Sequence, residues 1–461
     1  LGGQSRAGAL KLVYLVWKLL AALGSLGRRT RDFRATFDRV YARWHGQNLD
    51  AEPAESLVAA YRELERELLL EWKAPIINDF FAMIFFGVLK KLAPQHHNDL
   101  LCGEPGMEST IPTRSLLGMA GVIRRSGGLT ALFEDRDDAG VLRGVRDPKD
   151  RAYAEAAPLR EWLTTYLDRF GDRCMEELKL ETPTLRDDPG FLIATLRNYL
   201  GRPDLTPESM DVREHLVRSA AEADVKVAWL KRPLFGWILR RTRRHVRERE
   251  NLRFARTRIF GLVRRIFRAL GGHFTRVGLL EAPGDVFYLT VDEAIGLVEG
   301  TTSTVHVKPQ VAARQAEFQR YRVGPAPDSR FETRGGVHFG NPFVGAAVVV
   351  GAPSDPDTLQ GLGCAPGVVR ATARIVHSPK DDVRLNGQIL VCERTDPGWV
   401  PLFPTAGGLL VERGSALSHS AIVAREFGIP TVVGIPGLMK RIEDGQLVEL
   451  DGKTGVVRLR P

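Results

Sequence analysis

The sequence lacks the features of a disulfide scaffold, a thiolate zinc site or a membrane anchor. It contains only four cysteines, which are far apart and form no C-x-x-C pair: Cys102, Cys174, Cys364 and Cys392. This usage is typical of a reduced, cytoplasmic protein. The most apolar early stretch, residues 9–23, is interrupted by Lys11 and Lys18. It is shorter than the about 20 apolar residues of a spanning helix. We therefore expect a cytoplasmic chain without a membrane partner.

Metal and nucleotide motifs are also lacking. The pair His96-His97 has no third ligand at a metal-binding spacing, so we expect no metal site. The segment Gly452-Lys-Thr454 resembles the end of a phosphate-binding loop. That loop requires a glycine five residues before its final glycine, where this chain has Leu447. We therefore expect the chain alone to bind no cofactor.

Charge is the first feature present in excess. The net charge is +9, and nearly all of it lies before residue 356, much of it in the arginine-rich stretch 231–268. Such a run can bind nucleic acid, form a solvated helix face or provide a site for an anionic ligand. We favour the last two interpretations and expect no nucleic-acid partner.

The N-terminal three quarters predict a mostly helical domain over residues 1–350. With 461 residues the chain is long enough for two or three domains. Because it begins with Leu1, we expect a fragment or a processed product. Apolar residues recur three and four apart in 5–45, 54–93 and 159–178. Residues 301–350 lack this period, and we expect irregular structure with some strand there.

The pattern changes at a proline-bearing linker, residues 351–360. Short β-rich runs separated by Gly, Pro and Asp then follow: 368–376, 388–392, 408–412, 431–433, 447–450 and 456–459. One helix, residues 418–427, interrupts them. The expected fold class is multidomain, α plus α/β, in which the helical domain is followed by a C-terminal β/β/α domain over 361–461.

The chemistry concentrates at His419. A predicted strand ends at Glu412, a turn at Gly414 follows, and a helix begins near Ser418. The imidazole therefore stands at a helix N-terminus, whose free backbone N–H groups favour a phosphate. A neutral imidazole nitrogen can attack a phosphoryl group and leave again because its pKa lies near 7. A packed or capping histidine would show the same local pattern.

The residues after His419 resemble the signature of the phosphoenolpyruvate-utilising (PEP-utilising) enzymes, G-G-x-x-S-H-x-A-I-x-A-R-E-x-G-I-P. The matching residues are Gly414, Ser418, His419, Ala421, Ile422, Ala424, Arg425, Glu426, Gly428, Ile429 and Pro430. Ser415 replaces the second glycine of the pattern. The segments 363–367, 395–403 and 451–452 resemble further landmarks of the family. The resemblance implies a swivelling domain that carries phosphate on His419. It makes Gly414, Ser415, Ser418 and Arg425 candidates for supporting that phosphate.

The helical region resembles the acceptor domain of the rifampicin phosphotransferases, which precedes a C-terminal carrier. The resemblance rests on the segments 170–180, 249–253 and 278–289. It implies that Arg249 and Arg253 lie near the transferred phosphate, and their spacing of four places them on one helix face. Two exposed arginines are the competing interpretation. For Arg173 and Glu177 we expect a structural ion pair.

The resemblance implies a dikinase-type phosphotransferase that relays phosphate through His419 to a small-molecule acceptor with an antibiotic-like hydroxyl. The members that use ATP carry an ATP-grasp domain. This chain shows none, so ATP and Mg²⁺ are expected at an ATP-grasp portion in cis upstream or in trans. The alternatives are a phosphoenolpyruvate synthase-like portion that uses pyruvate, and a non-catalytic phosphocarrier or docking protein.

The lack of a nucleotide domain leads to the first prediction. Residues 1–461 alone should neither hydrolyse ATP nor bind it tightly, because no segment provides a strand-rich nucleotide site. Titration calorimetry of this chain with ATP and Mg²⁺ should give no binding heat at micromolar ATP. A clear micromolar isotherm would contradict this prediction and show that the helical region binds nucleotide.

Overall fold

The computed structural model describes residues 2–173, 178–324, 331–332, 344–345, 357–378 and 385–459. The chain divides into two compact units. The first joins residues 1–47, 62–263 and 357–461, and the second joins residues 48–61 and 264–356. The fold is mostly helical before the C-terminal mixed sheet, which confirms the expected fold class. The expected linker, 351–360, is described only from Asp357 onward, and its first six residues lie outside the described ranges.

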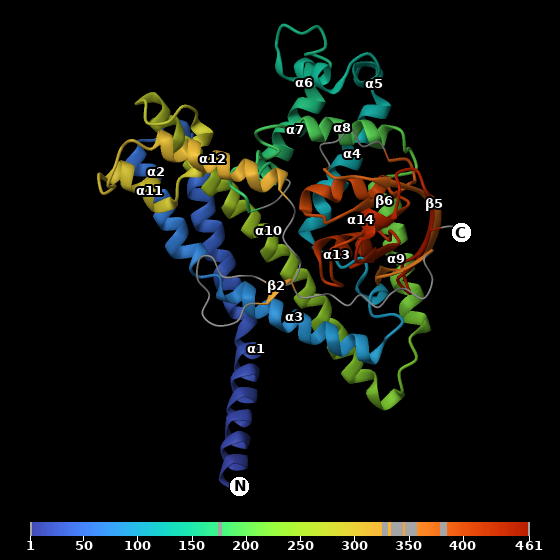
Figure 1. Ribbon diagram of the computed structural model, residues 1–461. Helices are drawn as coiled ribbons and strands as arrows, with labels where there is room; N and C mark the ends of the chain where they lie inside the picture. Colours follow the sequence, from blue (N-terminus) through green and yellow to red (C-terminus); the bar gives the residue numbers. More distant parts are fainter. Residues whose placement is uncertain are drawn as a thin grey trace. The chain divides into compact units, whose positions relative to one another are not determined.

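Helices of very different lengths form the N-terminal part of the first unit (Figure 1). Two long ones, α1 (Gly2–His45) and α10 (Arg232–Arg276), contain many of its charged residues, and α10 runs on into the second unit. The other α-helices are α3 (Lys73–Leu92), α4 (Ile111–Arg125), α5 (Gly127–Glu134), α6 (Asp138–Arg146), α7 (Ala157–Phe170), α8 (Gly190–Leu200) and α9 (Pro207–Asp224). Short 3-10 turns join several of them: η3 (Asp99–Leu101), η4 (Glu108–Thr110) and η5 (Trp229–Lys231).

One helical stretch, Ala54–Leu92, is long and apolar enough to cross a membrane by length and composition alone, and 44% of its apolar window is buried inside the protein. The stretch is not one continuous α-helix. It consists of α2 (Ala54–Leu64), the π-helical turn η2 (Glu65–Leu69), a further turn and α3. Phe81, Phe85 and Leu89 of α3 are buried in a hydrophobic cluster. One face of α3 therefore packs as a core helix does.

The C-terminal residues of the first unit form an eight-stranded mixed sheet in the order β3-β10-β9-β5-β6-β7-β8-β4. Its strands are β3 (Thr358–Gln360), β4 (Leu362–Ala365), β5 (Val368–Ile375), β6 (Ile389–Cys392), β7 (Gly408–Val411), β8 (Thr431–Val433), β9 (Leu447–Asp451) and β10 (Val456–Arg458). The six predicted strands are confirmed within one or two residues. The pairs β5-β6, β6-β7 and β7-β8 are parallel, and the remaining pairs are antiparallel.

The parallel pairs dictate where helices must lie. Two parallel neighbours need a crossover connection, so the chain between β6 and β7 forms the 3-10 helix η7 (Pro397–Thr405) and the chain between β7 and β8 forms α13 (His419–Glu426). Strands covered on both faces read as continuous apolar runs, and every residue of β6, β7 and β8 is buried. A last helix, α14 (Leu438–Arg441), precedes β9.

The eight strands and the segments that join them, residues 357–459, are here called the sheet domain. Two glycines let distant segments of this domain meet backbone to backbone. A Cβ on Gly452 would lie 1.9 Å from the Ala365 carbonyl oxygen, and one on Gly363 would lie 2.6 Å from the Gly452 carbonyl oxygen. The Gly452 N–H also donates to the Gly367 carbonyl. The sequence landmarks at 363–367 and 451–452 are therefore one structural feature.

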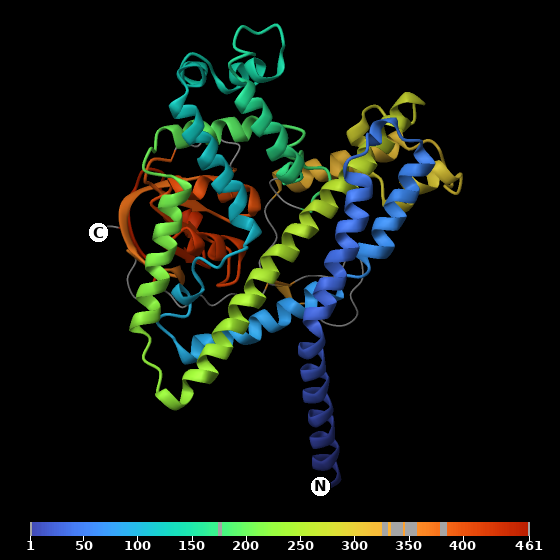
Figure 2. The same cartoon turned by 180° about the vertical axis from the view of Figure 1, so that it is seen from behind.

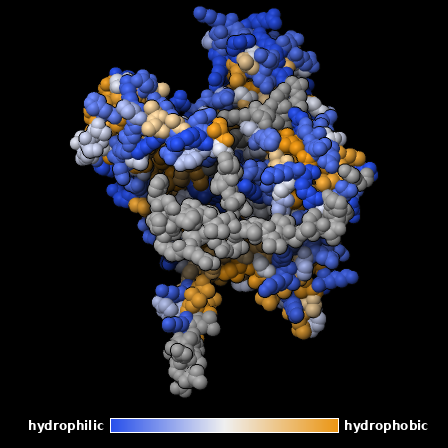
Figure 3. Space-filling model, viewed as in Figure 1, coloured by the Kyte–Doolittle hydropathy of each residue, from blue (hydrophilic) through white to orange (hydrophobic). Residues whose placement is uncertain are grey.

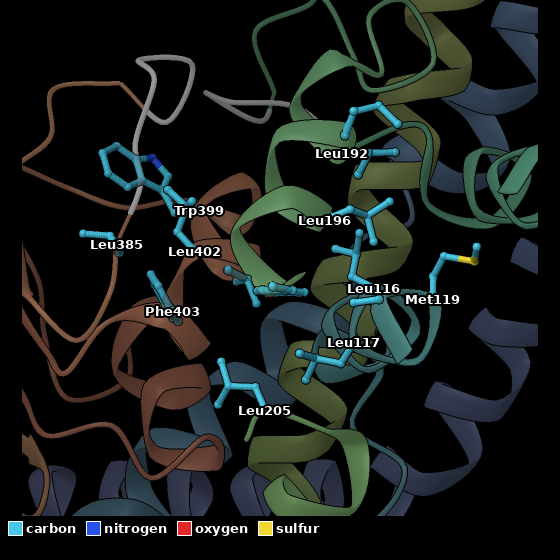
Figure 4. Packing of buried hydrophobic residues seen from close by; sticks show 14 of the residues in the cluster. Leu116, Leu117, Met119, Leu192, Leu196, Leu205, Leu385, Trp399, Leu402 and Phe403 are labelled. Carbon is cyan, nitrogen blue, oxygen red and sulfur yellow. The ribbon is translucent and has the colours of Figure 1, made fainter. Parts of the chain in front are cut away.

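One hydrophobic core joins the sheet domain to the helices of the first unit (Figures 1 and 2). Trp399, Leu402 and Phe403 of η7 belong to the same buried cluster as Leu192 and Leu196 of α8 (Figure 4). Residues of α4 complete the same cluster, as Figure 4 also shows. The Tyr199 hydroxyl donates to the Pro401 carbonyl within this interface. The packing holds the sheet domain in one position on the helices.

The second unit contains η1 (Leu49–Ala51), η6 (Pro283–Tyr288), α11 (Val291–Glu299), α12 (Lys308–Val323) and the strand pair β1 (Phe331–Glu332) and β2 (Val344–Gly345). The expectation of irregular structure from residue 301 is wrong for α12. That helix buries only Val311, so its sequence shows no apolar period. Its Arg314 instead forms an ion pair with Glu293 of α11. This pair acts together with the edge contact of Phe318 on Tyr288 and a hydrogen bond from Gln315 to Asp285, so α12 is held mostly by contacts that leave no apolar stripe in its sequence.

Candidate active site

His419 is the first residue of α13 and lies just beyond the carboxyl end of β7. Only 4% of its surface is exposed. Its Nδ1 lies 2.8 Å from the Glu250 Oε2 of α10. Its Nε2 is buried, and no hydrogen-bond partner for it is found among the described residues. The imidazole is therefore fixed through Nδ1, while Nε2 has no partner among the described residues.

Glu250 is the functional residue that the sequence analysis did not single out. It is 1% exposed, lies between the two predicted arginines, and is 169 residues from His419 in the chain. A carboxylate only accepts hydrogen bonds, so Nδ1 must be the protonated nitrogen of a neutral imidazole. It lies inside the segment 249–253, whose resemblance to the acceptor domain was the signal for it in the sequence.

The charges around this pair define its protonation states. Burial lowers the pKa of His419 below its usual value, although Glu250 opposes the shift, and Arg253 and Arg173 lower it further. Burial alone would raise the pKa of Glu250. Its net shift is downward because His419, Arg253 and Arg249 favour the carboxylate. Near neutral pH we therefore expect an ionised Glu250 beside a neutral His419 whose Nε2 carries a lone pair.

The structure places Arg249 in direct contact with the His419 loop. Its Nη1 donates to the Leu417 carbonyl at 2.8 Å and lies 3.3 Å from Glu250 Oε1. Its Nε lies 3.8 Å from Asp79 Oδ1 of α3. Arg253 follows one turn later on α10, half-buried, and no hydrogen-bond partner for its Nε is found in the described part of the chain. The two arginines and His419 thus meet around Glu250.

The candidate phosphate-supporting residues divide into two groups. Ser418 caps α13, since its Oγ accepts from the Ala421 N–H, and it lies 3.1 Å from Ser420 Oγ. Gly414 and Ser415 are exposed in the loop before it, where the Ser415 carbonyl accepts from the Ser418 N–H. This loop and its hydroxyl groups precede the imidazole directly.

Arg425 is buried and is not exposed with the loop that precedes His419. It is 1% exposed, and its guanidinium donates to the carbonyls of Cys364 and Ala416. In this arrangement it ties the loop before His419 to β4. A role for it in binding phosphate stays a prediction.

Several arginines of the basic stretch 231–268 contact acidic or aromatic side chains of other helices and turns. Arg243 pairs with Glu222, and Arg247 pairs with Glu104. Arg258 lies over the Tyr41 ring at 4.2 Å. Arg249 engages the His419 loop as described. These contacts favour the interpretation of the stretch as a packed helix face that provides an anion site.

The last residue of α13, Glu426, anchors the sheet domain on the helices. It is 2% exposed and accepts hydrogen bonds from the backbone N–H groups of Gly103 and Glu104. Burial and the nearby Glu214 raise its pKa to about 8. Burial also raises the pKa of Glu214 to about 7, against the effect of Arg114. Cys102 Sγ donates to the Arg425 carbonyl beside this contact.

Comparison with protein families assigns these two regions. Residues 384–455 match the PEP-utilising enzyme mobile domain, and residues 72–250 match the rifampicin phosphotransferase fourth domain. The expected resemblance is confirmed. The first match, here called the mobile domain, contains His419, and the second ends at Glu250. The buried hydrogen bond therefore joins one residue from each matched region.

Curated relatives cover most of this chain. An uncharacterised protein of Mycobacterium tuberculosis is 38% identical over 331 residues, covering 70% of this chain and 34% of the relative. A rifampicin phosphotransferase of Streptomyces sp. is 28% identical and covers 78% of this chain and 40% of the relative. A prodigiosin-synthesizing transferase of Serratia marcescens is 29% identical, with shares of 75% and 38%. The chain thus spans between a third and two fifths of the length of these relatives.

The position of Glu426 gives the second prediction. Its pKa of about 8 in the folded protein lies above the 4.5 of an ordinary glutamate, so the folded state binds more protons than the unfolded state between these values. Stability should therefore fall as pH rises from about 5 to about 8, by at most about 1.4 kcal/mol per pH unit for one proton. Glu426→Gln should remove this part of the slope in urea unfolding measured across that range.

Glu443, exposed on the same domain, provides the matched control. Glu443→Gln should keep the parental dependence of stability on pH. A Glu426→Gln profile parallel to the parent would show that Glu426 does not titrate in this window.

Proposed function

We propose that this chain is the acceptor-plus-carrier portion of an ATP-dependent, dikinase-type phosphotransferase. His419 receives a phosphoryl group and delivers it to the hydroxyl of a small-molecule acceptor. The observation that carries the proposal is the buried His419–Glu250 pair, which leaves Nε2 without a partner among the described residues. The buried His245 also has an Nε2 without a partner among the described residues, but its Nδ1 lies against the neutral Asn78 side-chain amide. The carboxylate on Nδ1, together with the open Nε2, is therefore what supports a phosphoryl-accepting role for His419.

Loading uses the lone pair of Nε2. The nitrogen attacks the phosphorus of a nucleotide phosphate, a P–N bond forms, and the P–O bond to the nucleotide breaks with its electron pair on oxygen. Because Nδ1 keeps its proton, the phosphorylated ring is cationic. This step takes place away from Glu250, at an ATP-grasp portion in cis or in trans that supplies ATP and Mg²⁺.

Discharge takes place where His419 meets α10. An acceptor hydroxyl oxygen attacks phosphorus, the P–N bond breaks, and its electron pair returns to Nε2, while the hydroxyl proton passes to solvent. The Nδ1 proton held by Glu250 means that a neutral imidazole leaves, which is far more favourable than an imidazolate. Glu250 thus orients the ring and stabilises its cationic form, as carboxylates do for catalytic and metal-bound histidines.

The arginines supply the charge that the transfer needs. A dianionic phosphoryl group entering a buried site requires compensating cations. Arg249 contacts the His419 loop, and Arg253 lies one turn further along the same face. This provision of charge favours transfer chemistry over the alternative of a non-catalytic phosphocarrier, which would need only a docking surface.

The acceptor is proposed only as a class. The names of the relatives refer to two unlike small molecules, rifampicin and prodigiosin, so the helical scaffold accommodates different chemistries. A hydroxylated small molecule is the first candidate and pyruvate the second. We propose a cytoplasmic location, and no nucleic-acid or membrane partner.

The third prediction tests the carrier. An ATP-grasp domain from a rifampicin phosphotransferase, with labelled ATP and Mg²⁺, should place an acid-labile label on His419. His419→Ala should abolish the label, and His377→Ala, which changes an exposed histidine of the same domain, should not. Acid-stable labelling, or labelling that survives His419→Ala, would contradict the proposal. So would an unlabelled chain when the donor's own mobile domain is labelled.

The fourth prediction tests the discharge site. In a pulse-chase experiment, His419 is loaded, the donor is removed, and rifampicin or pyruvate is added as the acceptor. Arg249→Ala and Arg253→Ala should each slow discharge about 10²-fold or more, the scale seen when one preorganised charge-stabilising group is lost. Glu250→Gln should slow discharge as well, because it removes the charge that stabilises the cationic ring. Loading should stay at the parental rate, since it occurs elsewhere.

Arg240 lies on the same helix and is exposed, so Arg240→Ala controls for a general loss of positive charge. If Arg249→Ala and Arg253→Ala both discharge like Arg240→Ala, the two arginines belong to a solvated face. The acceptor site must then lie on another helix.

A further inference from the structure

Arg173 is a buried cation that has no role in the reaction proposed for His419, Glu250, Arg249 and Arg253. It lies in the turn after α7 and is 5% exposed. Its guanidinium carbon lies 4.7 Å from the centroid of the Phe254 ring, and its Nε has no hydrogen-bond partner among the described residues. No carboxylate of the described chain lies within ion-pair distance of it. The expected partner Glu177 lies outside the described residues.

The turn that carries Arg173 is fixed against α10. The adjacent Asp172 accepts a hydrogen bond from the Tyr41 hydroxyl at 2.9 Å, and its Oδ1 lies 3.7 Å from Arg186 Nε. A Cβ on Gly261 of α10 would lie 2.3 Å from the Cβ of Asp172. Asp172 is therefore occupied by other groups. The close approach at Gly261 determines where the next residue, Arg173, can lie.

Helix geometry brings Arg173 and His419 to the same face of α10. Glu250, which holds His419, and Phe254, which holds Arg173, are four residues apart and so stand one above the other. The nearby charge of Arg173 also contributes to the lowered pKa of His419. Burial raises the pKa of Glu108 and the nearby Arg173 opposes that shift, but no ion pair joins these two described residues. A buried cation that no carboxylate of the described chain contacts is costly, so it is suited to a site that an anion enters.

We infer that Arg173 binds the phosphoryl group on His419 and, with Arg249 and Arg253, forms a three-arginine phosphate site. The phosphoryl oxygens supply the partner that the Arg173 Nε lacks among the described residues, and the planar guanidinium offers two parallel N–H donors to them. This inference deepens the proposed function by adding a phosphate-binding residue, and it rests on that function.

The test has an arm that does not need a loaded histidine. Orthophosphate binding to the unphosphorylated chain, followed by ³¹P NMR, should weaken about tenfold or more in Arg173→Gln, the loss expected when one charge-assisted hydrogen bond is removed. The midpoint of the His419 titration, followed by ¹H NMR, should move to higher pH, because one cation near the ring is gone. Arg173→Lys keeps the charge and should recover part of both effects.

Arg169 gives the matched control. It is exposed and lies 5.0 Å over the Phe170 ring, so Arg169→Gln removes an arginine from an aromatic ring outside the site. This variant should bind orthophosphate and titrate like the parent. Unfolding midpoints of all variants identify any that fail to fold, and Arg173→Lys then carries the comparison.

The second arm is discharge of phospho-His419, which Arg173→Gln should slow about 10²-fold without slowing loading. If Arg173→Gln is folded and matches Arg169→Gln in phosphate binding, His419 titration and discharge, Arg173 is structural and the inference fails. If the parent is never loaded on His419, the proposed function fails instead. The orthophosphate and titration arms still report on Arg173 in that case.

Discussion

The buried hydrogen bond between His419 and Glu250 is the constraint on which the site depends. Removing a carboxylate from water is costly unless it is paired and hydrogen-bonded. Glu250 meets that requirement with the imidazole on one oxygen and Arg249 near the other. This arrangement fixes the tautomer of His419 and leaves Nε2 as the atom with an available lone pair. The roles proposed for the surrounding arginines follow from that one fixed geometry.

The contact between the mobile domain and the helices combines apolar packing with groups that titrate. The cluster around Trp399 and Phe403 provides the nonpolar part of the contact. Glu426 and Glu214 lie at the same junction with raised pKa values. The proposed swivelling requires the mobile domain to leave this surface, and each carboxyl group then regains water. The interface thus positions His419 and also contains groups whose ionisation opposes docking.

The first unit also exposes apolar residues outside the arrangement around His419. Trp229, Leu230 and Leu234 are exposed near the start of α10, where Figure 3 shows hydrophobic surface. Val13, Trp17 and Leu20 are exposed on α1. These residues are not part of the arrangement around His419.

Local sequence determined the mobile domain and the position of His419. Turn residues, alternating short strands and a capped helix are short-range signals, and they predicted six strands, α13 and the histidine at its start. Long-range packing decided the rest. The sequence did not identify Glu250 because its partner is 169 residues away. The polar helix α12 was missed because it buries only Val311 and is held largely by polar contacts, so its sequence has no apolar period. Which arginine meets which carboxylate depends on how helices cross, and a one-dimensional pattern does not contain that information.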